Sequence, residues 1–126
     1  MNDLLRCAFC EDIEDRVVIE NSLAIAFWDK SPVSKGHCLI IPKRHIKDYF
    51  SSTRDEKMAI LDLLDEMKIL IDERYMPEGY NIGINCGEYS GQTIMHLHIH
   101  LIPRYKGDVI DPRGGVRGVI PGKQNY

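Results

Sequence analysis

Residues 91–104 decide the fold of this chain and read Gly-Gln-Thr-Ile-Met-His-Leu-His-Ile-His-Leu-Ile-Pro-Arg. From position 96 to position 102, histidine alternates with leucine and isoleucine. Successive side chains of a β-strand point to opposite faces, so this pattern predicts one apolar face and one face of imidazoles. We therefore predict a strand over residues 94–102, ended by Pro103, that divides its side chains into a core set and an imidazole set: Leu97, Ile99, Leu101 and His96, His98, His100.

Three imidazoles on one face of a sheet are not explained by packing, which leaves metal binding, phosphate chemistry or both. Histidines at i and i+2 can ligate one metal ion, but residues i and i+4 lie about 13 Å apart along a strand. The three histidines must therefore differ in role. Neutral imidazole is available near pH 7 as a nucleophile or proton carrier, and imidazolium binds phosphate oxygens, so a phosphoryl centre suits both forms.

The remaining strands are predicted from short runs of β-branched, aliphatic and aromatic residues. The first two of these runs flank Asn21-Ser22, which indicates a tight hairpin. The third ends at Pro42, because proline cannot continue a ladder of backbone hydrogen bonds. The four runs are residues 16–20, 23–29, 37–41 and 80–85.

Residues 53–75 form the one long helix that the sequence predicts. Apolar residues recur there at steps of three and four: Ile60, Leu61, Leu64, Met67, Ile71 and Tyr75. Thr53 and Glu56 have the spacing of a capping box, and Pro77 and Gly79 stop the helix. The predicted fold is therefore α+β, an antiparallel sheet of about five strands with one long helix.

Composition fits one globular domain over residues 1–126. The chain is 44% hydrophobic and 28% charged, and its formal net charge is −3. We expect no strongly basic nucleic-acid platform. The Gly/Pro-rich tail from about residue 106 has little core-forming power, and only its apolar residues argue for docking: Val116, Val119 and Ile120.

The location predicted from the sequence is cytoplasmic. No apolar run approaches the ~20 residues that span a bilayer, and Asp3 and Arg6 interrupt the N-terminal stretch where a secretory signal would be apolar. In a reducing compartment, the Cys7-x-x-Cys10 pair is expected to bind metal or act in redox chemistry rather than form a structural disulfide. Cys38 and Cys86 are expected to be small buried residues.

The chain resembles the histidine triad nucleotide hydrolases and transferases from Cys7 to about Pro121. Residues 91–104 follow the central pattern of that family. Its N-terminal half is matched by Asp29-Lys30-Ser31-Pro32, by Gly36-His37 and by Ile41-Pro42-Lys43-Arg44-His45. The histidine at position 37 is interpreted as structural. The resemblance implies the corresponding α+β fold and a homodimer.

The resemblance implies cleavage at the α-phosphate of a nucleoside 5′-phosphate conjugate, such as a diadenosine polyphosphate or a nucleoside phosphoramidate. His98 would attack the phosphorus and become nucleotidylated, and His100 would bind phosphate oxygens. Gln92 and Thr93 would reach the bridging oxygen and the leaving group, and Gly91 would offer a backbone donor.

Further positions of this chain are implied to bind the nucleotide, which is expected to be a purine nucleotide. Asp29 would accept hydrogen bonds from the ribose, and Asn85 would contact the phosphate or nucleoside. Phe27, Trp28 and Phe9 are candidate walls for the base, although Phe27 and Phe9 fit an ordinary core equally well.

The resemblance also implies a structural zinc ion, held by Cys7, Cys10, His45 and His96. Two sulfur and two nitrogen ligands make a closed tetrahedral site of the structural kind. Two alternatives to the covalent mechanism stay open at this point. One is a metallohydrolase in which His96 and His98 share a catalytic metal, and the other is a nucleotide-binding regulatory module without turnover. No partnership with nucleic acid or a membrane is expected.

Overall fold

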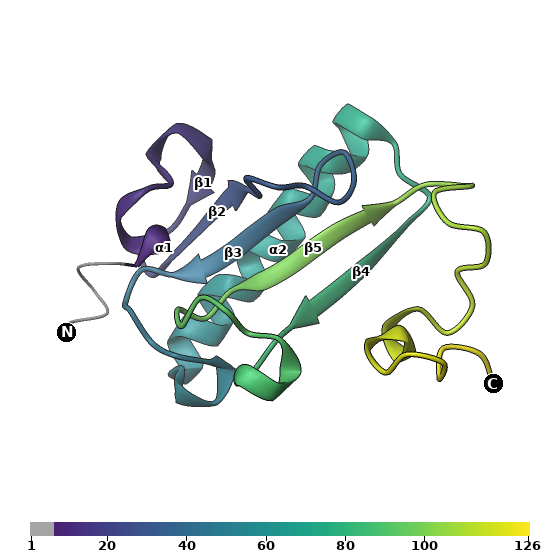
Figure 1. The fold of residues 1–126 in the computed structure, drawn as a ribbon. Helices are drawn as coiled ribbons and strands as arrows, with labels where there is room; N and C mark the ends of the chain where they lie inside the picture. Colours follow the sequence, from purple (N-terminus) through teal and green to yellow (C-terminus); the bar gives the residue numbers. More distant parts are fainter. Residues whose placement is uncertain (1–6) are drawn as a thin grey trace.

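The computed structural model describes residues 7–126. Asp3 and Arg6, on which the argument against a secretory signal rests, lie outside the described residues. Five antiparallel strands form one sheet in the order β1-β2-β3-β5-β4. They are β1 (Val17–Glu20), β2 (Ala24–Trp28), β3 (Cys38–Pro42), β4 (Gly79–Ile84) and β5 (Ile99–Arg104). With the long helix α2 (Arg54–Tyr75), this sheet confirms the predicted α+β fold (Figure 1).

Two apolar clusters lie on the two faces of the sheet. One forms between the sheet and α2, which runs behind the strands in Figure 1, and includes Ile40, Leu63, Met67 and Leu101. The other contains Phe9, Phe27 and Leu39 and lies under the N-terminal segment that carries the short helix α1 (Ala8–Glu11). Leu39 is paired with His100 across β3 and β5. The cavity-facing histidine of β5 therefore lies on the face opposite α2.

Local signals place the hairpin and α2 where the sequence predicts them. Asn21 Oδ1 accepts hydrogen bonds from the backbone N–H groups of Leu23 and Ala24, which closes the turn between β1 and β2. Thr53 and Glu56 form the reciprocal capping box, and Met76 ends α2 in the left-handed conformation. The buried residues of α2 differ from the prediction in part, because Leu61 is half exposed while Ala59 and Leu63 are buried.

The prediction of a strand from residue 94 is wrong, because β5 begins at Ile99 and continues through Pro103 to Arg104. The backbone before Ile99 makes other hydrogen bonds. The Leu97 N–H donates to the Ile46 carbonyl, and the His96 carbonyl accepts from the His98 ring. These bonds replace a ladder with a neighbouring strand. Leu97, Ile99 and Leu101 are nevertheless buried, as the alternation predicts.

The tail does not pack as its apolar residues suggest. Val116, Val119 and Ile120 are 61%, 74% and 58% exposed, and η5 (Gly115–Val119) lies beside β4. Within residues 7–126, no helix combines the length and apolar character needed to cross a membrane.

Candidate active site

A cavity of about 470 Å³ opens on the sheet face opposite α2. It brings together residues that lie far apart in the sequence, from α1 to β5. Among the residues predicted to form the site, those that line it are Phe9, Asp29, Asn85, Gly91, Thr93, His98 and His100. The two histidine rings lie side by side, with their centroids 5.2 Å apart.

His98 is held in one orientation by its own segment. Its Nδ1 lies 2.9 Å from the carbonyl oxygen of His96, and a carbonyl can only accept a hydrogen bond. The ring proton of neutral His98 therefore lies on Nδ1, and Nε2 carries a lone pair. Phe9 packs edge-on against the ring at 5.0 Å. Burial lowers the pKa of His98, which keeps the imidazole neutral at pH 7.

His100 lies in a chain of polar contacts that also includes His37 and Asp29. Its Nδ1 is 3.0 Å from Nε2 of His37, which is in turn 3.3 Å from Oδ2 of Asp29. Burial and the neighbouring rings of His98 and His37 lower the pKa of His100 to about 4. His37, interpreted from the sequence as structural, is thus in direct contact with a residue of the cavity.

The loop before β5 supplies neutral polar groups to the cavity. Gly91 has a φ of 102°, a left-handed conformation that favours glycine, and it ends η4 (Glu88–Ser90). The next but one residue, Thr93, is exposed at the cavity. Asn85 follows β4 directly, and a Cβ atom on Gly91 would lie 4.0 Å from its Nδ2. Three small or polar residues thus border the space in front of His98.

Gln92 does not line this cavity and is 2% exposed. Its Oε1 accepts from the Gly87 N–H, and its Nε2 donates to the carbonyls of Lys47 and Ile94. With its amide fully used by the backbone, Gln92 shapes the loop and has no group free to reach a leaving group.

Phe27 and Trp28 also lie outside the cavity. Phe27 is fully buried and packs against Phe9 at 5.4 Å, so it belongs to the core. Trp28 alternates with Phe27 along β2 and therefore faces the other side, where it packs against Tyr75 of α2. Of the three predicted walls for a base, only Phe9 borders the cavity.

A cluster of four metal-ligating side chains lies beside the cavity: Cys7, Cys10, His45 and His96. One ligand atom of each lies within 4.8 Å of the others. Nδ1 of His96 is 3.5 Å from both cysteine sulfurs, and Nδ1 of His45 is 3.4 Å from the Cys10 sulfur. The helix α1 makes this arrangement, because one turn of helix brings Cys7 and Cys10 to one side.

The donor geometry of this cluster fits a zinc ion. Bond lengths of ~2.3 Å to sulfur and ~2.05 Å to nitrogen imply S···N edges of about 3.5 Å in a tetrahedral site. A proton on Nδ1 of His96 could form a hydrogen bond with only one of the two sulfurs, whereas a metal ion bound to Nδ1 would be coordinated by both. The other ring nitrogen, Nε2, lies 2.8 Å from the Pro42 carbonyl and must donate to it, which leaves the lone pair on Nδ1 facing the sulfurs.

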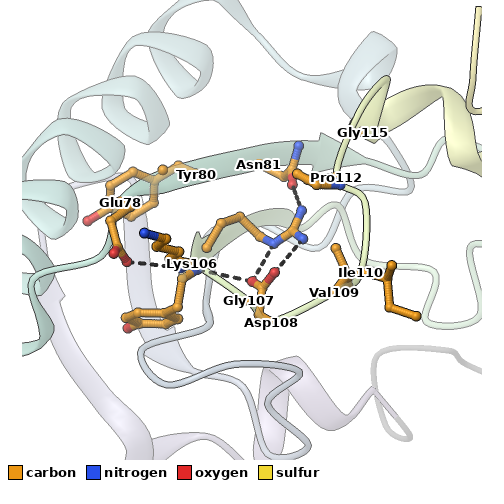
Figure 2. A pocket seen from close by; sticks show the side chains of 13 residues that line it. Glu78, Tyr80, Asn81, Lys106, Gly107, Asp108, Val109, Ile110, Pro112 and Gly115 are labelled. Carbon is orange, nitrogen blue, oxygen red and sulfur yellow. Dashed lines mark hydrogen bonds and ion pairs between the residues drawn. The ribbon is translucent and has the colours of Figure 1, made fainter.

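A second cavity, of about 590 Å³, lies between β4 and the tail and holds no histidine (Figure 2). Arg104 crosses it, with its guanidinium bonded to Asp108 on one side and to Asn81 on the other. The guanidinium of Arg104 is thus already paired within the cavity. The histidine cavity is therefore the better candidate for chemistry.

Sequence reasoning missed several residues of the site. Asp12, Arg16 and Leu39 line the histidine cavity, and Arg16 is held by the carbonyls of Asp12 and Trp28. No local pattern marks them, because they reach the site through tertiary packing. His37 had a usable signal, since it precedes β3 by one residue and shares a face with Leu39, the partner of His100.

This chain is similar in sequence to several known proteins. The chain is 42% identical over 105 residues to a 16.1 kDa HIT-like protein of Mycoplasma pneumoniae, a match covering 79% of this chain and 72% of the relative. It is 33% identical over 104 residues to adenosine 5′-monophosphoramidase hnt1 of Schizosaccharomyces pombe, covering 79% and 75%. It is also 31% identical over 96 residues to the asymmetrical bis(5′-nucleosyl)-tetraphosphatase of the same yeast, covering 76% and 53%.

Solved structures of other proteins are also similar to this chain. A HIT family protein from Bacillus anthracis superposes with a TM-score of 0.76 at 39% identity, covering 81% of this chain and 75% of the other. A Zn-bound histidine triad family protein from Mycobacterium smegmatis gives 0.75 at 27% identity, covering 85% and 81%. A family model described as HIT domain matches residues 11–107. With most of its length matched by that model and with a relative 42% identical, the chain belongs to the HIT family.

Proposed function

We propose that this protein cleaves nucleoside 5′-phosphate conjugates at the α-phosphorus through a nucleotidylated His98. The substrate is a diadenosine polyphosphate or a nucleoside phosphoramidate, the two classes named by the yeast relatives. The observation that carries this proposal is the hydrogen bond of 2.9 Å from Nδ1 of His98 to the His96 carbonyl. It leaves the lone pair of Nε2 on a buried, neutral imidazole beside a cavity.

The reaction has two displacements at phosphorus. In the first, the Nε2 lone pair of His98 forms a P–N bond as the bond to the leaving group breaks, the leaving oxygen or nitrogen takes a proton from water, and neutral His100 donates a hydrogen bond to the phosphate. In the second, water attacks the phosphorus, the P–N bond breaks and His98 is regenerated. Backbone and hydroxyl donors of Gly91 and Thr93 stabilise the charge on the phosphate oxygens.

The nucleoside occupies the part of the cavity between Phe9 and Asp29. The Phe9 ring offers an apolar surface to the base, preferably a purine because of its larger area. Asp29 accepts hydrogen bonds from ribose hydroxyls, and Asn85 contacts the phosphate. Phe27 and Trp28 take no part in this arrangement, because one is core and the other faces α2.

The geometry disfavours a metal shared by His96 and His98. One ring nitrogen of His96 faces the cysteines and the other donates to Pro42, so neither is available in the cavity. We instead assign Cys7, Cys10, His45 and His96 to a structural zinc ion. A regulatory module without turnover has no support in the cavity, where His98, His100 and Thr93 are all in place.

The test is product analysis by ion-exchange chromatography. Wild type, His98→Ala and the control Tyr89→Ala are incubated with diadenosine tetraphosphate or adenosine 5′-phosphoramidate, with and without inorganic phosphate. Tyr89 is fully exposed on the loop before Gly91, so Tyr89→Ala shows whether a substitution at an exposed position near the site by itself affects turnover. We expect AMP from wild type and from Tyr89→Ala only, and mass spectrometry of alkali-quenched wild type, in which a P–N bond survives, should show a chain carrying one AMP.

Each result has a distinct meaning. AMP with ATP from the tetraphosphate identifies a hydrolase, whereas ADP with ATP that appears only with phosphate identifies a phosphorylase. AMP from the phosphoramidate alone narrows the substrate class to P–N bonds. Turnover by His98→Ala at a near-normal rate would refute the covalent mechanism, and binding of AMP without turnover of either substrate would support the regulatory module.

We further propose a homodimer built on β4 and α2. The strand β4 is the edge of the sheet, and its Ile82 and Ile84 are exposed although they pair with the core residues Leu101 and Ile99. A partner that covers this apolar edge would stabilise it.

We also propose that residues 1–126 form one domain with an extended tail. We also propose a cytoplasmic location, a reducing compartment in which Cys7 and Cys10 would stay available to bind metal.

A further inference from the structure

A chain of two hydrogen bonds runs from the backbone into the cavity, and a carboxylate lies beside it. The N–H of Val33 points at Nδ1 of His37 at 3.1 Å, and Nε2 of His37 points at Nδ1 of His100 at 3.0 Å. Oδ2 of Asp29 lies 3.3 Å from the same Nε2. His37 is 3% exposed, so these contacts are its complete polar surroundings.

The first bond fixes the direction of the others. A backbone N–H can only donate, so Nδ1 of His37 carries a lone pair. Burial lowers the pKa of His37 more than Asp29 raises it, and the ring is neutral at pH 7 with its proton on Nε2. That N–H donates to His100, and the Asp29 carboxylate lies beside it. Nδ1 of His100 is therefore an acceptor, and the proton of neutral His100 lies on Nε2.

We propose that His37 is a positioning residue that sets the tautomer of His100, so that His98 offers a lone pair and His100 offers an N–H to the same phosphate. The inference rests on the proposed function for its consequence, although the tautomers themselves do not depend on it. His98 and His100 belong to one segment, yet the ring proton lies on Nδ1 in His98 and on Nε2 in His100. The His96 carbonyl accepts from His98, whereas the His37 N–H donates to His100.

The proximity of Asp29 explains why His100 needs this partner. Its carboxylate is near enough to act electrostatically on His100, and ligand atoms of Asp29, His37 and His100 lie within 4.8 Å of one another. Without the His37 N–H, the carboxylate would attract the His100 proton to Nδ1. His100 would then present a second lone pair to the phosphate, where a donor is needed.

The same bond excludes two other roles for His37. The cluster has the residue types of a metal site, but Nε2 of His37 is protonated as long as Nδ1 accepts from Val33, so a metal ion would have to break that bond. His37 is also no proton relay, because the lost Nε2 proton could not be replaced at the occupied Nδ1. His100 keeps its Nε2 proton and acts only as a hydrogen-bond donor, because a neutral imidazole that lost it would become an anion.

Two variants of His37 test the roles of its two ring nitrogens separately. Asn reaches as far as Nδ1 and keeps the bond to Val33, but it has no donor for His100. Gln reaches as far as Nε2 and offers an N–H there. Long-range ¹H–¹⁵N spectra of ring-labelled histidine report the tautomer of His100, and backbone spectra report folding. We expect the Nε2–H form in wild type and His37→Gln, and the Nδ1–H form in His37→Asn.

Kinetics on the nucleotide substrate give the second measurement. We expect kcat to fall about tenfold or more in His37→Asn with a KM within about threefold, because the missing N–H acts on the transition state. His37→Gln should remain within about threefold of wild type. An Nδ1–H tautomer of His100 in the wild type, or an unchanged tautomer in folded His37→Asn, would overturn the proposal.

Zinc titration provides the control for the metal alternative. With the four-ligand cluster filled, added zinc should leave the ring signals of His37 and His100 unchanged, and a specific shift of both would overturn the proposal. These spectra need no turnover. A protein that shows the expected tautomers but cleaves no nucleotide would refute the proposed function alone.

Discussion

His100 couples the chemistry of the site to the stability of the protein. Its pKa lies near 4 in the folded chain, against an ordinary value of 6.5, because burial and the rings of His98 and His37 disfavour the cation. As the pH falls below 6.5, the unfolded chain binds a proton at this position before the folded chain does. Stability is therefore complete above pH 6.5 and is lost progressively as the pH falls toward about 4.

We predict that the Tm, measured by circular dichroism, declines over this range, and that His100→Gln reduces the decline. The decline should not vanish in this variant, because burial also lowers the pKa values of His37, His96 and His98. Glu56 does not contribute to this range, since its bond to Arg44 holds its pKa near 2 and its own loss begins below about 4.5. A Tm that stays constant from pH 7 to pH 5 would contradict the prediction.

Among the elements, α2 depends on its first turn. Glu56 is buried, accepts from the Thr53 N–H and forms two hydrogen bonds with the Arg44 guanidinium. We predict that Glu56→Ala lowers the free energy of unfolding in urea by about 2 kcal/mol, through the lost cap and an Arg44 without its partner. Glu56→Gln keeps the cap and should lose about half as much, while the exposed Glu66→Ala should change little. Equal losses in the two Glu56 variants would show that the capping box contributes nothing.

The proposed zinc site joins three segments that share no strand pairing: α1, the connection after β3 and the segment before β5. His96 links the cluster to the proposed nucleophile, because its carbonyl accepts a hydrogen bond from the His98 ring. We predict about one zinc ion per chain by mass spectrometry of metals. Cys10→Ser should lower both the zinc content and the Tm, through a loss of several kcal/mol. Cys86→Ser, which alters a cysteine outside the cluster, should change neither, and a metal-free wild type of unchanged Tm would contradict the assignment.

Local chemistry explains which elements could be predicted from the sequence. The Asn21 turn, the capping box at Thr53 and the alternation of residues 97–101 each depend on neighbours along the chain, and each is found in the structure. The start of β5 could not be predicted in this way. Residues 94–98 look like a strand, but their backbone is bonded to Ile46 and to the side chains of Gln92 and His98.

The residues of the candidate site also divide into those that local sequence motifs predict and those that depend on distant contacts. The resemblance of short motifs placed His98, His100, Thr93 and Asp29, and these residues do border one cavity. The burial of Phe27 and of Gln92 depends on contacts with distant segments, as does the contact between His37 and His100, which are 63 positions apart. Such contacts are set by tertiary packing, to which a single sequence gives no direct access.

At the scale of the whole molecule, both α2 and the edge strand β4 expose apolar side chains. Leu61 and Ile69 of α2 are 49% and 61% exposed, and Ile82 of β4 is 51% exposed. Ile82 points to the α2 side of the sheet, because it pairs with the core residue Leu101. Beyond β4 stands the tail, drawn in yellow in Figure 1, with its own exposed apolar residues. This side is the surface on which we place the second copy of the chain.

We predict that wild type is a dimer in sedimentation-velocity experiments at micromolar concentration and that Ile82→Asp shifts it toward monomer. A carboxylate buried at a two-fold interface meets its copy nearby and loses its hydration, so the penalty is paid twice per dimer. Val33→Asp is the matched control, because Val33 is also strongly exposed but lies on the loop before β3, away from β4. Its backbone N–H, which orients His37, is retained in that variant. A dimer that survives Ile82→Asp but is lost in Val33→Asp would place the interface on the loop instead, and a monomeric wild type would remove the proposed dimer.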